Sequence, residues 1–238
     1  MNKLLIMVKG VIMTMSMIGF AHAENSWTGF YAGANAGFAF NNAELTSQQL
    51  GFTNPSETCN TSSNFSTFFP GVQAGYLYQF PNNFVSGIEA NVTVNTNQTD
   101  TLNCRSNINP DVYDGFTFRN QMQGSIRGRI GNVWNWNNNT FLPYLTAGAS
   151  FANVGLTYQN EGGDYYANNT IQAGWLLGAG IEWAFMQHWS LRAEYYYVNY
   201  GETINLKLPS IYDLRDPNGS ARVDLTSSNI VVALNYWI

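Results

Sequence analysis

The sequence is poor in charge, because Asp, Glu, Lys and Arg together make up only 11% of its 238 residues. The mean hydropathy is nevertheless −0.18, since Asn, Thr, Gln and Ser supply the polarity. The formal net charge is −5. Nucleic-acid phosphates attract basic surfaces, so this acidic balance argues against a nucleic-acid partner.

Long apolar runs are also missing beyond the first 23 residues, so the sequence has no candidate for a spanning helix of about 18 or more apolar residues there. The leader has Lys3 and Lys9, an apolar run over 11–20, and the small-x-small triplet Ala21-His22-Ala23. This pattern predicts a signal peptide over 1–23 and a single domain over 24–238. Removing the leader's two lysines lowers the net charge from −5 to −7.

Histidine is scarce as well. Of two histidines, His22 lies in the leader and His188 lies in a short polar segment, so a histidine general base is not available elsewhere. The acids Asp164, Asp213 and Asp216 lack the spacing of a calcium loop. We therefore expect no enzyme, no cofactor and no metal site.

What the sequence does contain is strict alternation. From Ile171 to Phe185 every second residue is apolar, whereas the residues between them are mostly small or polar. This period of two indicates a strand, and its length exceeds the ~5–6 residues that are usual for a strand in a soluble sheet. After a turn at Met186–His188 the same alternation resumes. A hairpin of long strands with one apolar and one polar face is typical of a transmembrane β-barrel.

Eight alternating segments can be counted: 27–40, 65–80, 84–97, 117–134, 141–158, 171–185, 189–200 and a last strand ending at 238. The fifth shows an apparent phase slip near Asn153–Val154, which suggests a bulge there. The connections alternate long and short, with long loops expected at 41–64, 98–116, 160–169 and 201–222. Short periplasmic turns, long extracellular loops and an even strand number are the pattern of outer-membrane barrels.

Tryptophans gather at the strand ends assigned to the periplasm, where they predict an aromatic girdle: Trp27, Trp134, Trp136, Trp183, Trp189 and Trp237. A soluble barrel would instead enclose its apolar face and expose the charged one. The sequence therefore predicts an all-β fold, an eight-stranded antiparallel up-and-down transmembrane β-barrel in the bacterial outer membrane, with membrane lipid as its main partner.

Several stretches along the whole mature chain resemble the opacity-protein-like family of small outer-membrane barrels: Trp27–Gly33, Gly124–Gly131, Pro143–Gly148, Gly178–Glu182 and Glu194–Tyr197. Such proteins usually end in an aromatic residue, whereas this chain ends in Ile238. The resemblance implies a bacterial surface antigen, and some relatives are described as adhesins, haem binders or weak porins.

Seven charged residues on the polar faces form the main candidate site: Glu89, Arg119, Arg127, Arg129, Glu182, Arg192 and Glu194. An eight-stranded barrel is only wide enough for side chains to fill it, and isolated charges inside it would cost several kcal/mol. We interpret the set as a structural ion network that plugs the lumen. A proton or small-ion path is the alternative. On strand 171–185, Gly178→Ser on the lumen face is expected to be milder than Ala179→Arg on the lipid face.

Function is expected at four extracellular loops, whose aromatics favour contact with a host surface protein or glycan: Phe52, Phe65, Tyr113, Tyr165, Tyr166 and Tyr212. A structural or adhesive surface protein is the main hypothesis. A narrow porin-like channel and a haem-binding surface protein remain alternatives. The only two cysteines, Cys59 and Cys104, lie in the first two of these loops, and an even count in an exported chain predicts a disulfide.

Overall fold

The chain folds as a closed antiparallel β-barrel with eight strands in its wall, as a computed structural model shows. The structure describes residues 26–49, 57–96, 99–105, 113–137, 139–159, 165–208 and 219–238. The signal peptide expected over 1–23 lies outside these residues. Among them, no helix is long and apolar enough to cross a membrane. The strands are β1 Gly29–Gln49, β2 Glu57–Gln79, β3 Phe84–Val94, β4 Thr99–Arg105, β5 Tyr113–Asn132, β6 Trp134–Trp136, β7 Asn139–Gln159, β8 Tyr165–Met186, β9 Trp189–Leu208 and β10 Gly219–Trp237.

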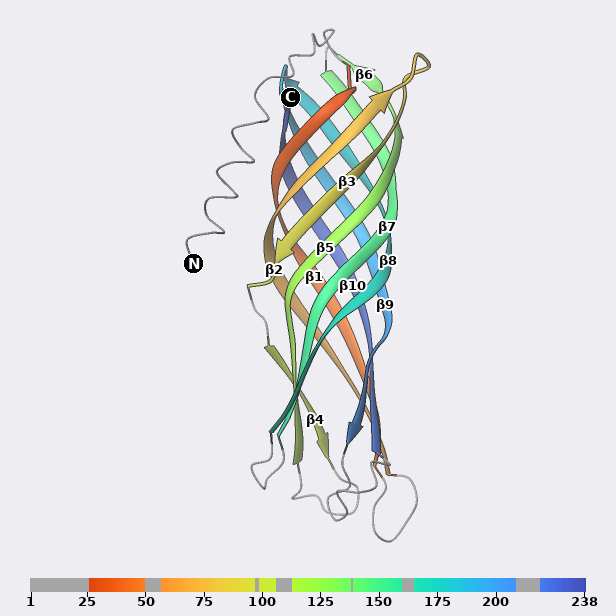
Figure 1. Cartoon of the computed structure of the whole chain (residues 1–238). Coiled ribbons are helices and arrows are strands. Elements are labelled where there is room, and N and C mark those ends of the chain that lie inside the picture. The colour runs from red at the N-terminus through yellow and green to blue at the C-terminus, as the bar shows by residue number, and fades with distance from the viewer. Residues whose placement is uncertain are drawn as a thin grey trace, which may run out of the picture.

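Each wall strand pairs with its sequence neighbour, and β1 pairs with β10 to close the barrel. Two short strands extend this wall: β4 continues the chain beyond β3 and pairs with β5, and β6 pairs with β7. Figure 1 shows the strands strongly tilted, with the C-terminus at the same end as β6 and opposite to β4. The turns between β2 and β3, β6 and β7, and β8 and β9 share the end of the C-terminus. These short turns mark the periplasmic end.

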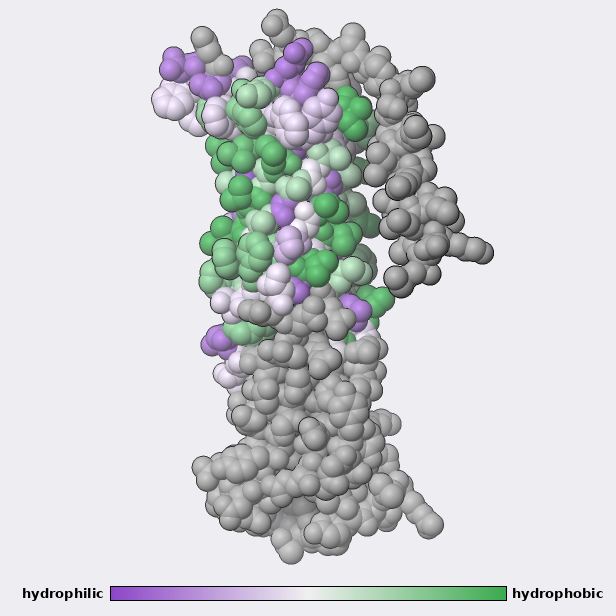
Figure 2. Space-filling model, turned by 90° about the vertical axis from the view of Figure 1, so that its left-hand side faces the viewer, coloured by the Kyte–Doolittle hydropathy of each residue, from purple (hydrophilic) through white to green (hydrophobic). Residues whose placement is uncertain are grey.

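The alternation predicted for every wall strand is confirmed. On β8, Ile171, Trp175 and Leu177 face outward, whereas Glu182 is fully buried in the lumen. Large apolar side chains are exposed on every wall strand. On the face shown in Figure 2 they form a band, and hydrophilic residues lie at the periplasmic end. A side chain that is half exposed in the isolated protein is in contact with lipid once the barrel is in the membrane. The apolar band is therefore the membrane-facing surface.

The aromatic girdle is only partly as expected. Trp134, Trp136 and Trp189 are exposed at the periplasmic end, and the Trp189 ring lies 5.1 Å from that of Tyr236. Trp27 and Trp237, in contrast, are 3% and 6% exposed. Their rings meet edge to face at 5.5 Å inside the barrel mouth. The prediction that all six tryptophans face the interface was wrong for these two, because position at a strand end does not decide which face a residue occupies.

The strands run much further than the alternation indicated. β2 has 23 residues and β8 has 22, whereas about 9–11 suffice to cross a bilayer. Most of the four expected long loops is therefore strand, including Tyr113, Tyr165 and Tyr166. Phe65, at the start of the strand expected over 65–80, lies well inside β2, and Phe52 and Tyr212 lie outside the described residues. Beyond the membrane both faces of the wall can be polar, so hydrophobic alternation disappears although the strand continues.

The bulge expected in the fifth strand lies in its neighbour. β7 alternates without a break from Leu142 to Val154, with Asn153 outside and Val154 inside. The register shifts instead between Asn120 and Met122 of β5. An apolar residue at an inward position made the alternation of β7 look shifted, because the lumen at that height is lined by Ala152 and Val154 rather than by polar groups.

Gly178 faces the lumen as expected, but it leaves no room for a side chain. A Cβ atom built there would lie 2.5 Å from both the Tyr195 carbonyl oxygen and the Tyr196 Cβ. The expectation that Gly178→Ser is much milder than a charge at Ala179 on the lipid face therefore does not hold. The lumen is packed closely enough that small residues there are required by sterics rather than merely tolerated.

Candidate functional site in the barrel interior

Six charged side chains lie together in the lumen and balance one another. Glu89 comes from β3, Arg127 and Arg129 from β5, Glu182 from β8, and Arg192 and Glu194 from β9. Their side chains are at most 2% exposed. Three guanidinium groups face three carboxylates, so this group has no net charge when all six are ionised. We call these six residues the lumen network.

Glu89 is the centre of the lumen network. One of its oxygens accepts hydrogen bonds from the Arg127 guanidinium, which is also its direct cross-strand partner. The other oxygen accepts from Arg192 Nη1 at 2.5 Å and from the Tyr31 hydroxyl at 2.5 Å. Arg129 Nη1 lies 3.5 Å from the same oxygen. One carboxylate thus contacts all three arginines, and the contact with Arg192 crosses the barrel from β3 to β9.

The other two carboxylates close the network. Arg127 Nη1 lies 2.5 Å from Glu194 Oε1, and the Tyr144 hydroxyl donates to the second oxygen of Glu194. Arg129 Nη2 donates to Glu182 Oε2 at 2.6 Å, and its guanidinium stacks 3.9 Å above the Tyr144 ring. Charged hydrogen bonds of this kind are stronger than neutral ones. Each buried charge is therefore both paired and hydrogen-bonded, as burial requires.

Neutral side chains extend the network to the remaining strands. Ser190 Oγ and Asn235 Nδ2 donate to Glu182 Oε1 at 2.6 and 2.7 Å. Gln73 accepts from Arg192 Nη2 at 2.5 Å and donates to Asn235. With Tyr31 from β1, Gln73 from β2, Tyr144 from β7 and Asn235 from β10, every wall strand contributes a hydrogen-bonding group. These neutral partners were not in the predicted site. The alternation along each strand nevertheless places them on the inward face, which could have identified them.

Packed layers lie on both sides of the lumen network. Towards the periplasm, an apolar cluster fills the mouth: Trp27, Tyr31, Leu77, Val85, Val133, Leu142 and Trp237. Trp237 Nε1 also donates to Ser190 Oγ at 3.0 Å, which connects this cluster to the network. On the extracellular side Ala39, Phe69 and Val231 pack together with Tyr196. The lumen is thus filled in three successive layers, apolar, ionic and apolar.

Arg119 is the one predicted charge that the structure does not place in this network. Its backbone lies in β5, opposite Gly155 of β7, and its side chain lies outside the described part. The bulge at Gln121 separates it from Arg127 and Arg129, so the simple alternation that assigned it to the lumen is interrupted. Its role stays a prediction, as does the disulfide, because the side chains of Cys59 in β2 and Cys104 in β4 also lie outside the described part.

The long tilted strands, the apolar outer band and the packed charged lumen together define an outer-membrane β-barrel. Residues 10–236 match the family model of the outer membrane protein beta-barrel domain, so the chain belongs to that family. It is 28% identical over 191 residues to the 31 kDa outer-membrane immunogenic protein of Brucella melitensis biotype 1, covering 74% of this chain and 72% of that protein. It is 26% identical over 213 residues to the 25 kDa outer-membrane immunogenic protein of Brucella abortus biovar 1, covering 90% and 80%.

Among solved structures, the outer membrane protein OprG from Pseudomonas aeruginosa superposes with a TM-score of 0.54 at 12% identity, covering 89% of this chain and 96% of that one. This likeness shows the fold. The family and the relatives show the location and class, so the protein is an outer-membrane β-barrel surface protein. The family expected from the sequence resemblance is confirmed.

Neutralising Glu89 is expected to destabilise the barrel strongly. Glu89→Gln leaves three arginines facing two carboxylates, and breaking a buried ion pair in this way typically costs roughly 3–5 kcal/mol. The free energy of unfolding is measured by denaturant titration of the protein folded into lipid vesicles. Glu44→Gln, an exposed carboxylate on β1 beyond the apolar band, is the matched control and should lose little.

A second substitution distinguishes the effect of charge balance on stability from the effect of altered side-chain volume. Glu89→Gln combined with Arg127→Gln removes one charge of each sign, so the double variant should lose less stability than the sum of the two single variants. Simple additivity, or an effect of Glu89→Gln no larger than that of Glu44→Gln, would contradict the charge-balanced network.

Proposed function

We propose that this is a structural or adhesive surface protein whose partner contacts take place at the extracellular end, and that the barrel itself acts as a closed support. The observation that carries this proposal is the length of the wall: strands of about 20 residues continue well past the apolar band. A barrel that only had to cross the membrane would not need this extension. The extension places the extracellular ends of the strands away from the bilayer surface.

The described part of this extension has a polar outer face over three neighbouring strands. Asn42 of β1 pairs with Asn64 of β2, and Glu44 pairs with both Ser62 of β2 and Asp224 of β10. We call these five residues the extracellular patch. Hydroxyl, amide and carboxylate groups side by side are suited to hydrogen bonds with a glycan or with a basic protein segment. This chemistry supports a host surface protein or glycan as the partner.

The proposal includes no catalysis and no cofactor. The carboxylates and arginines of the lumen network are engaged with one another, and apolar clusters lie on both sides of them along the barrel. The haem-binding alternative depends on extracellular tyrosines such as Tyr165 and Tyr166, whose side chains lie outside the described part. The extracellular patch offers oxygen and amide groups, which supports recognition of a polar surface.

Adhesion is tested by displaying the protein on a bacterial host that does not bind animal cells by itself. Expression should increase adherence to cultured host cells, and replacing Glu44, Asn64 and Asp224 together by Ala should reduce that gain. Gln187→Ala, an exposed polar change in the periplasmic turn between β8 and β9, is the control and should leave adherence unchanged. Treating host cells with glycosidase or with trypsin distinguishes a glycan from a protein partner. Adherence that does not change on expression would refute the proposal.

The disulfide between Cys59 and Cys104 belongs to the same proposal. Thr96 donates its hydroxyl to the Phe68 carbonyl oxygen at 2.8 Å, so the chain entering β4 lies beside β2. Cys59 is nine residues beyond Phe68 towards the extracellular end, and Cys104 is eight residues beyond Thr96 in the same direction. Nearly equal distances along neighbouring segments favour the Cα separation of ~4.4–6.8 Å that a disulfide requires. The bond would hold β4 against β2.

Labelling of intact cells with a membrane-impermeant maleimide tests this bond. Label should be incorporated only after a reductant is added, since the oxidising periplasm through which the chain passes favours the bridge. Cys59→Ser serves as the control, because it should leave Cys104 free and labelled without reductant. Labelling of the unreduced wild-type protein would show free thiols and rule out the disulfide.

A further inference from the structure

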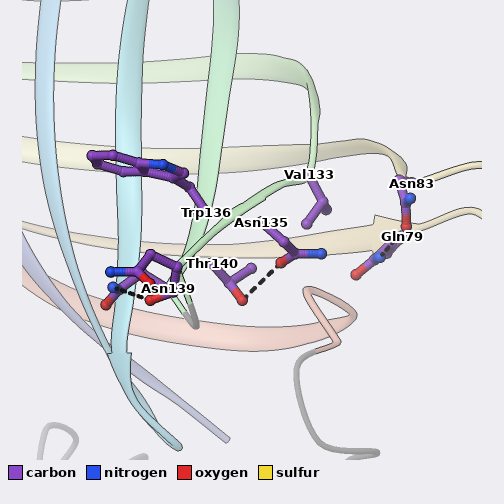
Figure 3. Close-up of a pocket in the computed structure, with 8 residues that line it drawn as sticks. Gln79, Asn83, Val133, Asn135, Trp136, Asn139 and Thr140 are labelled. Atoms are coloured by element: carbon purple, nitrogen blue, oxygen red, sulfur yellow. Dashed lines mark hydrogen bonds between the residues drawn. The ribbon is translucent and has the colours of Figure 1, made fainter.

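A polar pocket of about 380 Å³ lies at the periplasmic mouth, away from the extracellular patch. It is formed where the turn between β2 and β3 meets β6 and the start of β7 (Figure 3). Five carboxamide side chains line it: Gln79, Asn83, Asn135, Asn137 and Asn139. Thr140, Val133 and Trp136 complete the lining, so the pocket contains no charged side chain.

The side-chain carbonyl oxygens of several of these amides already accept hydrogen bonds from the protein. Thr140 donates its hydroxyl to Asn135 Oδ1 at 3.0 Å (Figure 3). Gln79 accepts from the Trp27 backbone N–H at 2.9 Å, and Asn83 Oδ1 accepts from Gln79 Nε2 at 3.4 Å. For Asn83 and Asn135, no acceptor for the side-chain nitrogen is present among the residues that the structure describes. Figure 3 shows the Asn135 nitrogen turned away from Thr140. The pocket therefore offers uncharged N–H donors.

An apolar surface accompanies these donors. The Trp136 side chain is 67% exposed beside the pocket, and Val133 lines its inner side. Val133 lies beside the amide N–H groups, whereas the Trp136 indole extends to the side opposite to the Asn135 nitrogen (Figure 3). The amides and Val133 suit a carbonyl oxygen that carries a small methyl group, and the indole suits an apolar ring face further along a longer ligand. An ionic ligand would find no counter-charge here, and burying an unpaired charge is unfavourable.

We propose that this pocket binds an N-acetylated amino-sugar chain from the periplasm. The acetamido carbonyl of one sugar accepts from the Asn135 and Asn83 nitrogens and its methyl group packs on Val133, while another sugar ring of the same chain lies against the Trp136 indole. The mouth faces the compartment in which the cell-wall glycan has this chemistry. Such a contact would attach the barrel non-covalently to that glycan, and it does not depend on what the extracellular patch binds.

The test titrates the whole mature barrel with triacetylchitotriose by calorimetry. The detergent must have no sugar headgroup, because a maltoside would compete for the pocket. Maltotriose, which lacks the acetamido groups, is the ligand control. Asn135→Asp is the informative variant, because it keeps the shape of the side chain and the acceptor for Thr140 but replaces the N–H donors by an oxygen. Its affinity should fall about tenfold, as loss of one to two hydrogen bonds predicts.

A matched exposed amide provides the protein control. Gln187→Ala in the turn between β8 and β9, outside both the pocket and the extracellular patch, should bind the trisaccharide as the wild type does, and heat-modifiable migration in gels verifies that each variant is folded. Trp136→Phe keeps an aromatic ring at the interface and should weaken binding less than Trp136→Ala. No heat of binding with triacetylchitotriose, equal affinity for maltotriose, or an unchanged affinity of the folded Asn135→Asp variant would each overturn the proposal.

Discussion

Burial of charge in a narrow lumen is the constraint on which the rest of this structure depends. Three guanidinium groups and three carboxylates have been removed from water, and they are tolerated because Glu89 contacts all three arginines while Glu182 and Glu194 complete the pairing. An isolated charge in that position would cost several kcal/mol. Hydrogen-bonding groups reach this network from all eight wall strands, so the network can form only when every strand is in its correct register. It therefore acts against register slips, which a long alternating strand would otherwise permit.

The same constraint underlies our proposal for where the barrel binds its partners. Paired charges between two apolar clusters occupy the described part of the lumen, which supports our proposal that partners bind at the two ends of the barrel. At the extracellular end the wall continues as a polar tube beyond the apolar band. At the periplasmic end Trp27 and Trp237 close the mouth, and the carboxamides of the adjoining turns form a shallow polar pocket. In this proposal the barrel connects two binding surfaces, and the lumen network links all eight of its wall strands.

The sequence was sufficient for the fold, because lipid imposes a period of two on every strand that it touches. This alternation predicts which residues face lipid, from Phe30 to Tyr236. It also predicts the inward positions of Glu89, Arg127 and Arg192. It failed where lipid is absent, because β1 and β2 continue through polar segments that lack alternation. At Trp237 the alternation was right, since it places this residue on the inward face with Asn235, and the girdle assignment from its position at the strand end was wrong. The partners in the network could not be predicted either. Glu182 and Arg192 are directly opposite in register, yet Arg192 donates to Glu89 and Gln73, because a long side chain can reach partners on strands that do not pair with its own.

Single-channel recording of the purified protein in planar lipid bilayers tests the central claim that a charge-balanced lumen keeps the barrel closed. The account predicts that the wild-type protein inserts without producing stable conductance steps. Replacing the central carboxylate and its cross-strand arginine by small side chains, as in the double variant Glu89→Ala with Arg127→Ala, should open water-filled space in the lumen. That variant should then produce small, salt-dependent conductance steps. Stable steps of reproducible size from the wild-type barrel, unchanged in that variant, would contradict it and would favour a narrow pore.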